Sequence, residues 1–538
     1  MAAFSLGRAI PARAFGYPAF AQRAIFWNTS QAKMATPIAA RGLIRRAIDR
    51  GARSATLPYA DQEQVMANLS LPGNPRYQPK DLQSVFGYDN LFRAIAEVEI
   101  ATLKTLADIG IIPEANIASL TPAVEQELLA ISTSEVDDVE RNVTKHDIRA
   151  WIRIAQSKVD PGLRRWIHVP LTSYDALDTA RALQFVRGHE VVKRLTDKVI
   201  GHFVEQVDLF ALQPQIGRTH GQHALPITVG FWLATILSRI LTNIQSANTA
   251  ADKLVGKISG AVGVYNAQVG LGIAARCGDK TFEARVLEKL GLKPAPISTQ
   301  ILSPEPLADY LFACVKLSAA FGQFGRDGRH LMRTEIAELG EPFEKGQVGS
   351  STMAHKRNPI NFENLEGTWI KNQVEFGKVL ATMISEHQRD LVGSPIARDF
   401  PTIVVNLVNQ LNTLLREAGG KPFISRISVD EASLRRNFAA QGDAILAEPI
   451  YIALQMAGYE GDAHELVNHV AMPRSGQEGV SLLEATQWAL AQQSADQVWS
   501  KIPAETINML GKPETYTGAA AAKARDIAAS AEAYLKGV

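Results

Sequence analysis

Five long stretches in the middle of the chain repeat apolar residues every three or four positions. This spacing places the apolar side chains on one face of an α-helix, whereas a half-buried strand would alternate them at every second position. Little such alternation occurs in this part of the sequence. We therefore predict an all-α chain whose middle is a bundle of long helices. The five stretches cover about residues 175–210, 228–255, 306–315, 369–384 and 404–415.

The overall composition is that of a folded protein with almost no net charge. Of the 538 residues, 46% are hydrophobic, which excludes a chain too polar to form a core. Lys and Arg number 56 against 55 Asp and Glu, whereas a protein held by nucleic-acid phosphates is usually more basic. The mean hydropathy is -0.04, and no apolar run reaches the about 18 residues of a membrane span. We expect neither a nucleic-acid partner nor a membrane span.

The first 48 residues differ from the rest of the chain. They contain no Asp or Glu but seven basic residues and many alanines. This composition is typical of an organelle transit peptide, and it suits equally an unstructured extension or a start codon placed too early, with Met34 as the true start.

The two cysteines, Cys277 and Cys314, fit a reducing compartment or plain core packing. We expect a cytoplasmic protein, with a mitochondrial or other organellar location as the alternative if the leader is a transit peptide.

The densest polar cluster covers residues 349–359 and is followed by Glu363. Its glycine, its small hydroxyl residues and its lack of apolar periodicity predict a mobile loop. Such a loop can close over a ligand, and its backbone N–H groups, hydroxyls and Lys356 suit an anionic group. The alternative is an ordinary polar surface loop.

A second cluster, residues 217–226, lies between two predicted helices and contains His220 beside Gly221. We expect a helix junction there that aims His220 into a cleft, where its near-neutral pKa suits acid–base catalysis. His223 follows three residues later, but no carboxylate or cysteine stands at metal-ligand spacing beside the two histidines. The alternative is a hydrogen-bonded structural turn.

Three further polar clusters lie near predicted helix ends. Residues 144–147 contain a His-Asp pair, a combination that is common on protein surfaces. Residues 171–178 include Thr172 and Ser173, which are good N-caps, and the same helix N-terminus would also suit a carboxylate or phosphate. Residues 387–398 contain two arginines that match phosphate geometry, with ordinary ion pairs as the alternative.

Residues 349–359 resemble the signature loop of the fumarase/aspartase superfamily of lyases. The superfamily pattern Gly-Ser-Ser-x-Met-x-x-Lys-x-Asn-Pro is matched throughout. His355 precedes the signature Lys, where fumarases and aspartases usually have Gly or Ala and argininosuccinate lyases usually have Gln. Ala354 departs from the usual Pro, but this removes no chemical group. Within the superfamily the chain resembles the adenylosuccinate lyase family from about residue 76 to the C-terminal region, with matches at residues 76–77, 145–147, 172–173, 218–221, 298–300 and 389–398.

This resemblance implies three mainly helical domains around a central five-helix bundle. Four chains would pack their bundles into a homotetramer, and each active site would draw residues from more than one chain. We expect the domain boundaries near residues 172 and 429. The resulting segments are an N-terminal extension (1–57), an N-terminal helical domain (58–172), a central bundle domain (173–428) and a C-terminal helical domain (429–538).

The reaction implied by the resemblance is a β-elimination. It would release fumarate from adenylosuccinate, giving AMP, and from the succinylated carboxamide ribotide of purine synthesis. Ser350 is carried over as the general base and His220 as the general acid. Glu363 would hold the His220 imidazole, and Lys356 and Asn358 would stabilise the carbanion. The resemblance implies no metal and no organic cofactor.

The resemblance also assigns contacts with the nucleotide substrate. They fall into a group for the succinyl end or its neighbouring groups, a group of general substrate contacts and a group for the nucleotide and its phosphate. The groups are Thr172, Ser173, Thr219 and Gln300; Lys145, His146 and Asp147; and Arg76, Tyr77, Arg389, Ser394 and Arg398.

Two other interpretations stay open. The first is another lyase or cycloisomerase of the superfamily, such as carboxymuconate cycloisomerase, whose substrate has no use for phosphate-binding arginines. The second is a structural protein that kept the fold and lost its activity, as lens crystallins did. The presence of His220, Ser350, Lys356 and Glu363 argues against the second interpretation.

Overall fold

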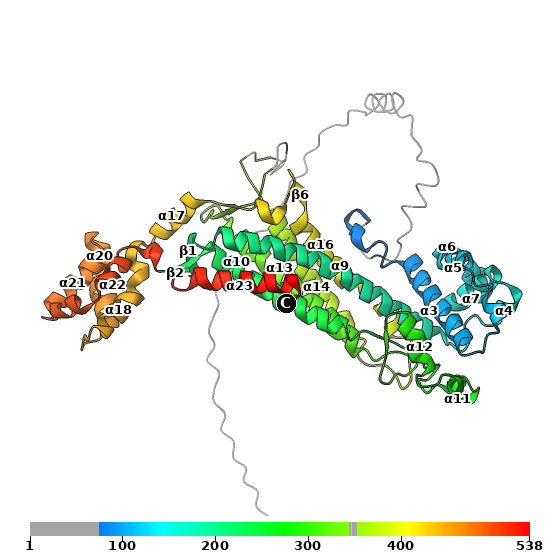
Figure 1. Ribbon diagram of the computed structural model, residues 1–538. Helices are drawn as coiled ribbons and strands as arrows, with labels where there is room; N and C mark the ends of the chain where they lie inside the picture. Colours follow the sequence, from blue (N-terminus) through cyan, green and yellow to red (C-terminus); the bar gives the residue numbers. More distant parts are fainter. Residues whose placement is uncertain (1–70, 72–74, 344–345, 347–351, 354) are drawn as a thin grey trace, which may run out of the picture. The chain divides into compact units, whose positions relative to one another are not determined.

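The computed structural model describes residues 71, 75–343, 346, 352–353 and 355–538. Most of these residues lie in α-helices, and the strands among them are short (Figure 1). The predicted helical fold class is confirmed. No helix in the described part of the chain is both long and apolar enough to cross a membrane.

Five long helices pack against one another in the middle of the chain, as the apolar spacing predicts (Figure 1). Their buried aliphatic and aromatic side chains form one continuous core. The helices are α9 (Ser173–Leu209), α10 (Val229–Ala251), α13 (Glu305–Leu331), α14 (Ile360–Leu380) and α16 (Pro401–Leu415).

Close contact between α13 and α14 depends on glycine. A Cβ atom on Gly322 would lie 2.7 Å from the Trp369 side chain, and one on Gly328 would lie 2.4 Å from the Phe362 ring. Contacts that rise along α13 fall along α14, so the two helices run antiparallel. Helices approach this closely only where one of them carries no side chain at the contact.

Two further cores lie outside the bundle. The first joins the opening turns of α9 to α3 (Tyr88–Asp108), α5 (Pro122–Leu129), α7 (Asp147–Lys158) and α12 (Phe282–Lys289). The second is formed by C-terminal helices, and the last helix, α23, leaves them and packs against α9 and α10. The helices of this second core are α18 (Ala447–Met456), α20 (Met472–Glu478), α21 (Leu482–Gln492) and α22 (Ala504–Leu510), whereas α23 (Ala520–Lys536) belongs to the bundle core. The domain boundaries stay predictions.

Short elements connect these helices. The helices are α4 (Glu114–Ile117), α6 (Thr133–Val139), α8 (Pro161–Arg164), α11 (Asn266–Gly270), α15 (Gly393–Ala397), α17 (Glu431–Ala439) and α19 (Ala463–Glu465). The two-residue strands are β3 (Val255–Gly256), β4 (Lys293–Pro294), β5 (Leu339–Gly340), β6 (Glu417–Ala418), β7 (Lys421–Pro422) and β8 (Ser428–Val429).

The expected helix junction around His220 is a β-hairpin instead. Strands β1 (Pro214–Thr219) and β2 (Gln222–Thr228) pair antiparallel between α9 and α10. His220 and Gly221 form the two-residue turn with φ angles of 53° and 79°. Two successive positive φ angles match the twist of a tight hairpin, and Gly221 adopts such an angle without strain. Neither strand alternates apolar and polar residues: β1 has a single large apolar residue, Ile216, and the apolar residues of β2 follow one another from Ala224 to Ile227.

Candidate functional site

A cavity of about 500 Å³ lies at the N-terminal end of α9. Segments from the bundle core, from the core around α3 and α7, and from the α14–α16 connection form its wall. Nine residues that the resemblance assigns to substrate binding line this one cavity. They are Lys145, His146, Asp147, Thr172, Ser173, Gln300, Arg389, Ser394 and Arg398.

The start of α9 places Thr172 and Ser173 in the cavity wall. Thr172 is the N-cap residue, and its N–H donates to Oδ2 of Asp175 at 2.9 Å. The remaining N–H groups of a helix N-terminus carry a partial positive charge. This part of the wall can therefore bind a carboxylate or phosphate.

A change of backbone conformation presents Lys145, His146 and Asp147 to the cavity. A π-helical turn, Glu140–Thr144, ends at Lys145, which has a left-handed φ of 54°. His146 is the N-cap residue of α7, and its Nδ1 lies 3.1 Å from Oδ1 of Asp147. Both side chains are about half exposed.

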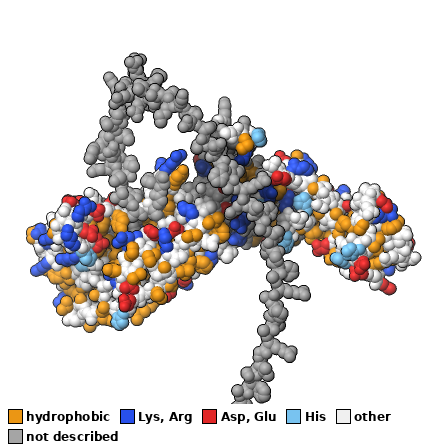
Figure 2. All heavy atoms as spheres, turned by 180° about the vertical axis from the view of Figure 1, so that it is seen from behind, with side chains coloured by type: hydrophobic (Ala, Val, Ile, Leu, Met, Phe, Trp, Pro, Cys, Tyr) orange, Lys and Arg blue, Asp and Glu red, His pale blue; other side chains and the backbone are white. Residues whose placement is uncertain are grey.

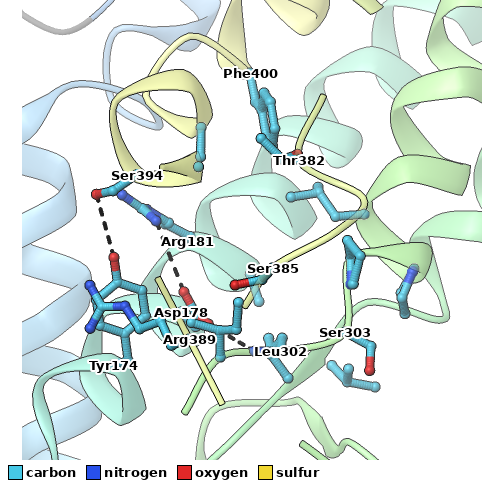
Figure 3. Close-up of a pocket in the computed structure, with 18 of the residues that line it drawn as sticks. Tyr174, Asp178, Arg181, Leu302, Ser303, Thr382, Ser385, Arg389, Ser394 and Phe400 are labelled. Carbon is cyan, nitrogen blue, oxygen red and sulfur yellow. Dashed lines mark hydrogen bonds and ion pairs between the residues drawn. The ribbon is translucent and has the colours of Figure 1, made fainter. Parts of the chain in front are cut away.

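Arg389 is fixed by an aromatic ring and an amide. Its guanidinium carbon lies 3.5 Å from the centroid of the Tyr174 ring, and its Nη1 donates to Oε1 of Gln300 at 2.8 Å. Figure 3 shows Arg389 lying against Tyr174, whose hydroxyl is 3.5 Å from Oγ of Ser394. A planar guanidinium held in this way is oriented for bidentate binding of an anion.

The charge of the cavity favours an anionic ligand. Among the described residues, four basic side chains face two acidic ones across the lining: Lys145, Arg181, Arg389 and Arg398 against Glu140 and Asp147. Burial and the nearby Asp147 carboxylate raise the pKa of Glu140, one of these two acidic residues.

A smaller, mostly apolar cavity of about 170 Å³ adjoins the first and shares Tyr174, Arg181 and Arg389 with it (Figure 3). Asp178 lines its wall. The Asp178 Oδ2 accepts from the Leu302 N–H at 3.0 Å, and its Oδ1 lies 3.9 Å from Arg181. Burial outweighs these partners and raises the pKa of Asp178.

The predicted acid, His220, lies at the other end of α9. Thr219 and His220 are exposed at the tip of the β1–β2 hairpin. An ion pair to the buried Glu338 fixes this hairpin, because Arg218 donates from both terminal guanidinium nitrogens, at 2.5 and 3.1 Å. Gln215, from the same strand, donates to the same carboxylate at 2.8 Å.

Glu341, three residues after Glu338, holds the start of α14. Its carboxylate accepts from the N–H groups of Asn361 and Phe362, each at 2.8 Å, and thus caps the helix. The two glutamates therefore join the hairpin to the start of α14 at this end of the bundle. Glu363 stands exposed in the first turn of α14.

The other predicted catalytic residues belong to the same segment. Lys356 is exposed, and Asn358 precedes α14 by two residues. Ser350 lies outside the described residues. The roles of these residues, and the pairing of Glu363 with His220, stay predictions.

The structure separates the predicted catalytic residues, together with Thr219, from the nine predicted binding residues that line the cavity. Thr172 caps the start of α9, and His220 follows its end. The helix has 37 residues, which is about 55 Å at 1.5 Å per residue. Within one chain, His220 therefore cannot reach a ligand in the cavity. Arg76 and Tyr77 lie in a 3₁₀ turn that lines neither cavity, and Tyr77 is exposed.

Several residues at the two ends escaped the sequence interpretation. Tyr174, Arg181 and Asp178 share the 171–178 region or the turn after it, so helical periodicity from Thr172 could have found them. Glu338 and Glu341 left no such signal, because their partners are far away in the sequence. In the described part of the chain, no cluster of three His, Cys, Asp or Glu side chains could hold a metal ion.

Comparison with known proteins agrees with this architecture. A lyase family model matches residues 62–373. The adenylosuccinate lyase of Pyrococcus horikoshii is 32% identical over 85% of this chain and 96% of its own length. The adenylosuccinate lyase of Synechocystis sp. is 32% identical over 75% of this chain and 89% of its own length. A solved structure, the 3-carboxy-cis,cis-muconate lactonizing enzyme from Pseudomonas putida, has the same fold, with a TM-score of 0.71 at 23% identity over 85% of this chain and 98% of that one. The chain belongs to the lyase family of the fumarase/aspartase superfamily and is an enzyme of that class.

Proposed function

We propose that this lyase splits adenylosuccinate into AMP and fumarate, and that it also releases fumarate from succinylaminoimidazole carboxamide ribotide. The observation that carries the proposal is the cationic cavity at the start of α9. It gathers nine residues that match the adenylosuccinate lyase pattern. Both substrates carry a phosphate and two carboxylates, and the arginines and the helix N-terminus of this cavity suit such groups.

In the proposed reaction, Ser350 removes a proton from the carbon next to a succinyl carboxylate. The electron pair of that C–H bond forms the double bond of fumarate as the C–N bond breaks. Lys356 and Asn358 stabilise the extra negative charge on the carboxylate before the bond breaks. His220 then gives a proton to the leaving nitrogen.

In this proposal the active site requires more than one chain, because the catalytic His220 and the binding residues of the cavity lie at opposite ends of α9. The cavity of one chain would receive the hairpin and the signature loop of another, so that His220 and Ser350 meet the substrate. A closed homotetramer, as the resemblance implies, would supply such pairs of unlike ends.

The test is an ultraviolet assay of the purified protein with adenylosuccinate, with chromatography of the products. We expect AMP and fumarate in equal amounts. A Ser350→Ala variant should bind substrate and assemble like the wild type but lose turnover, because it has no base. A folded wild-type protein without product would contradict the proposal, and turnover of a carboxymuconate substrate would replace it. Normal turnover by Ser350→Ala would remove Ser350 from the role of base.

A further inference from the structure

A buried ion pair lies beneath the start of α9, and the proposed chemistry does not use it. Asp175 and Lys257 approach to 2.5 Å, with side chains 1% and 0% exposed. Burial of two charges costs desolvation energy, so an ion pair of this kind is weak support for stability. Its contacts indicate another role.

The Asp175 carboxylate joins the start of α9 to the segment after β3. Its Oδ2 accepts from the N–H of Thr172 at 2.9 Å. Its Oδ1 accepts from the N–H groups of Ser259 and Gly260, each at 3.1 Å, as well as from Lys257. One side chain therefore fixes the N-cap residue of the cavity and a loop more than eighty residues away.

Ser259 carries this connection to the segment that contains Gln300. Its Oγ lies 2.6 Å from Oγ of Ser298, and both hydroxyls are at least partly buried. Gln300 follows two residues later and accepts from Arg389 in the cavity wall. The hydroxyl pair thus holds the chain directly before Gln300.

A second contact holds the chain directly after Gln300. The Leu302 N–H donates to Asp178, which stands three residues after Asp175 on α9. Gln300 is therefore tied to the first turns of α9 on both sides. Because α9 also presents Thr172, these contacts set the spacing between Gln300 and Thr172 across the cavity.

We infer that Asp175 is a positioning residue of the substrate site: with Lys257 and the Ser259–Ser298 hydroxyl pair it forms a tether that holds Gln300 at a fixed place opposite Thr172. The inference rests on the proposed function, in which Gln300 and Thr172 bind the succinyl end. It assigns a role to four residues that touch no substrate.

The first test is the Ser259→Ala variant, which removes one hydroxyl from the tether. We expect KM for adenylosuccinate to rise about fivefold, the range of one neutral hydrogen bond, while kcat stays within about twofold. The reason is that a displaced Gln300 weakens binding in the ground state and the transition state alike. His220, in the β1–β2 hairpin, makes no contact with these serines.

Ser318→Ala is the matched control. Ser318 is also a fully buried serine with one side-chain partner, Gln410 at 2.7 Å, but it lies in the bundle core. The melting temperature should fall by a similar amount in both variants, whereas KM should rise only in Ser259→Ala. An equal KM in the two variants would overturn the inference. It would mean that the Ser259 hydroxyl contributes to stability, as that of Ser318 does, but not to the position of Gln300.

Two combined variants test the tether as a unit. Ser259→Ala with Ser298→Ala should raise KM no more than either change alone, since both remove the same contact. Asp175→Asn with Lys257→Met leaves no buried charge unpaired and should raise KM in the same direction. Additive effects in the first variant, or an unchanged KM in the second, would contradict the tether.

The outcomes separate this inference from the proposed function. If the wild type splits adenylosuccinate and Ser259→Ala keeps the wild-type KM, the tether is wrong and the function stands. If the folded wild type forms no AMP or fumarate, the function falls, and this inference falls with it.

Discussion

Among single residues, Asp178 shows how burial changes the pKa of a carboxyl group. Its pKa is raised by burial although Arg181 and the Leu302 N–H favour the ionised form. The folded protein therefore binds this proton more tightly than the unfolded chain does. The free energy of unfolding must fall as the pH rises from the ordinary value of 3.8 through the raised pKa.

An Asp178→Asn variant should remove this pH dependence. Asparagine keeps an acceptor for the Leu302 N–H but carries no charge to desolvate. We expect no change of melting temperature near about pH 4, and a stabilisation that grows toward about pH 7, as thermal unfolding across this range would show.

The exposed Asp279 provides the control. Its side chain is 85% exposed, so Asp279→Asn should give a pH profile parallel to that of the wild type. A stabilisation by Asp178→Asn that shrinks toward neutral pH would contradict the assigned direction of the pKa shift.

Among the elements, the pair α13 and α14 depends on the absence of side chains at its contact. A Cβ atom on Gly325 would lie 2.5 Å from the carbonyl oxygen of Phe362 and 2.8 Å from the Leu365 Cβ. Neither atom can move without displacing α14 itself. The start of α14 carries Glu363, so this packing also sets the place of a predicted catalytic residue.

Gly325→Ala should therefore destabilise the protein by about 1–3 kcal/mol, because the two helices must separate. Chemical denaturation would measure the change. Gly201→Ala in α9 is the counterpart, since its added Cβ would meet nothing within 4 Å. That variant should gain about 0.5–1 kcal/mol, because alanine loses less backbone entropy in a helix than glycine. A stabilised Gly325→Ala would show that the helices adjust freely.

At the scale of the whole molecule, the two ends of α9 carry complementary halves of the proposed site. The bundle also leaves apolar side chains in solvent, with Ile370 47%, Val374 70% and Leu380 59% exposed on α14. Figure 2 shows hydrophobic side chains spread among charged ones over the face it displays. Ile370 and Val374 lie one turn apart on the same side of α14, as expected of a surface that a second chain would cover in the proposed oligomer.

Mixed oligomers of two inactive variants should therefore regain activity. His220→Gln damages the hairpin end and Arg389→Ala damages the cavity end, so a site built from the intact end of each is complete. Random mixing of equal amounts should restore about a quarter of wild-type turnover if each site joins two chains. Differently tagged chains, produced together and purified through both tags, would provide the hybrids.

Each variant produced alone is the control and should be inactive. Hybrids that carry both tags but remain inactive would contradict a site shared between chains.

Much of the fold followed from local patterns. The apolar spacing located all five bundle helices, although the fourth predicted stretch extends to Ile384 and α14 ends at Leu380. Helix formation depends on neighbours three and four positions apart, so a single sequence carries that information. The β1–β2 hairpin was missed because two positive φ angles at His220 and Gly221, rather than apolar alternation, produce it.

The candidate site was predicted only in part. The resemblance named the residues, and nine of them line one cavity. The residues that hold the site in place were not predicted, because each acts through a partner distant in the sequence, as Asp175 does with Lys257 and Arg218 with Glu338. The separation of His220 from the cavity was also not visible before the length and direction of α9 were known.

The sequence by itself determined the helices, the signature loop and the kinds of chemical group available, because these depend on residues close together along the chain. Only the tertiary structure decided which groups meet. It brought Gln300 and Arg389 to Thr172 and placed His220 in the hairpin beyond the far end of α9, a helix about 55 Å long. A rigid helix cannot bring its own two ends together, so the arrangement of this site depends on packing and not on the order of residues.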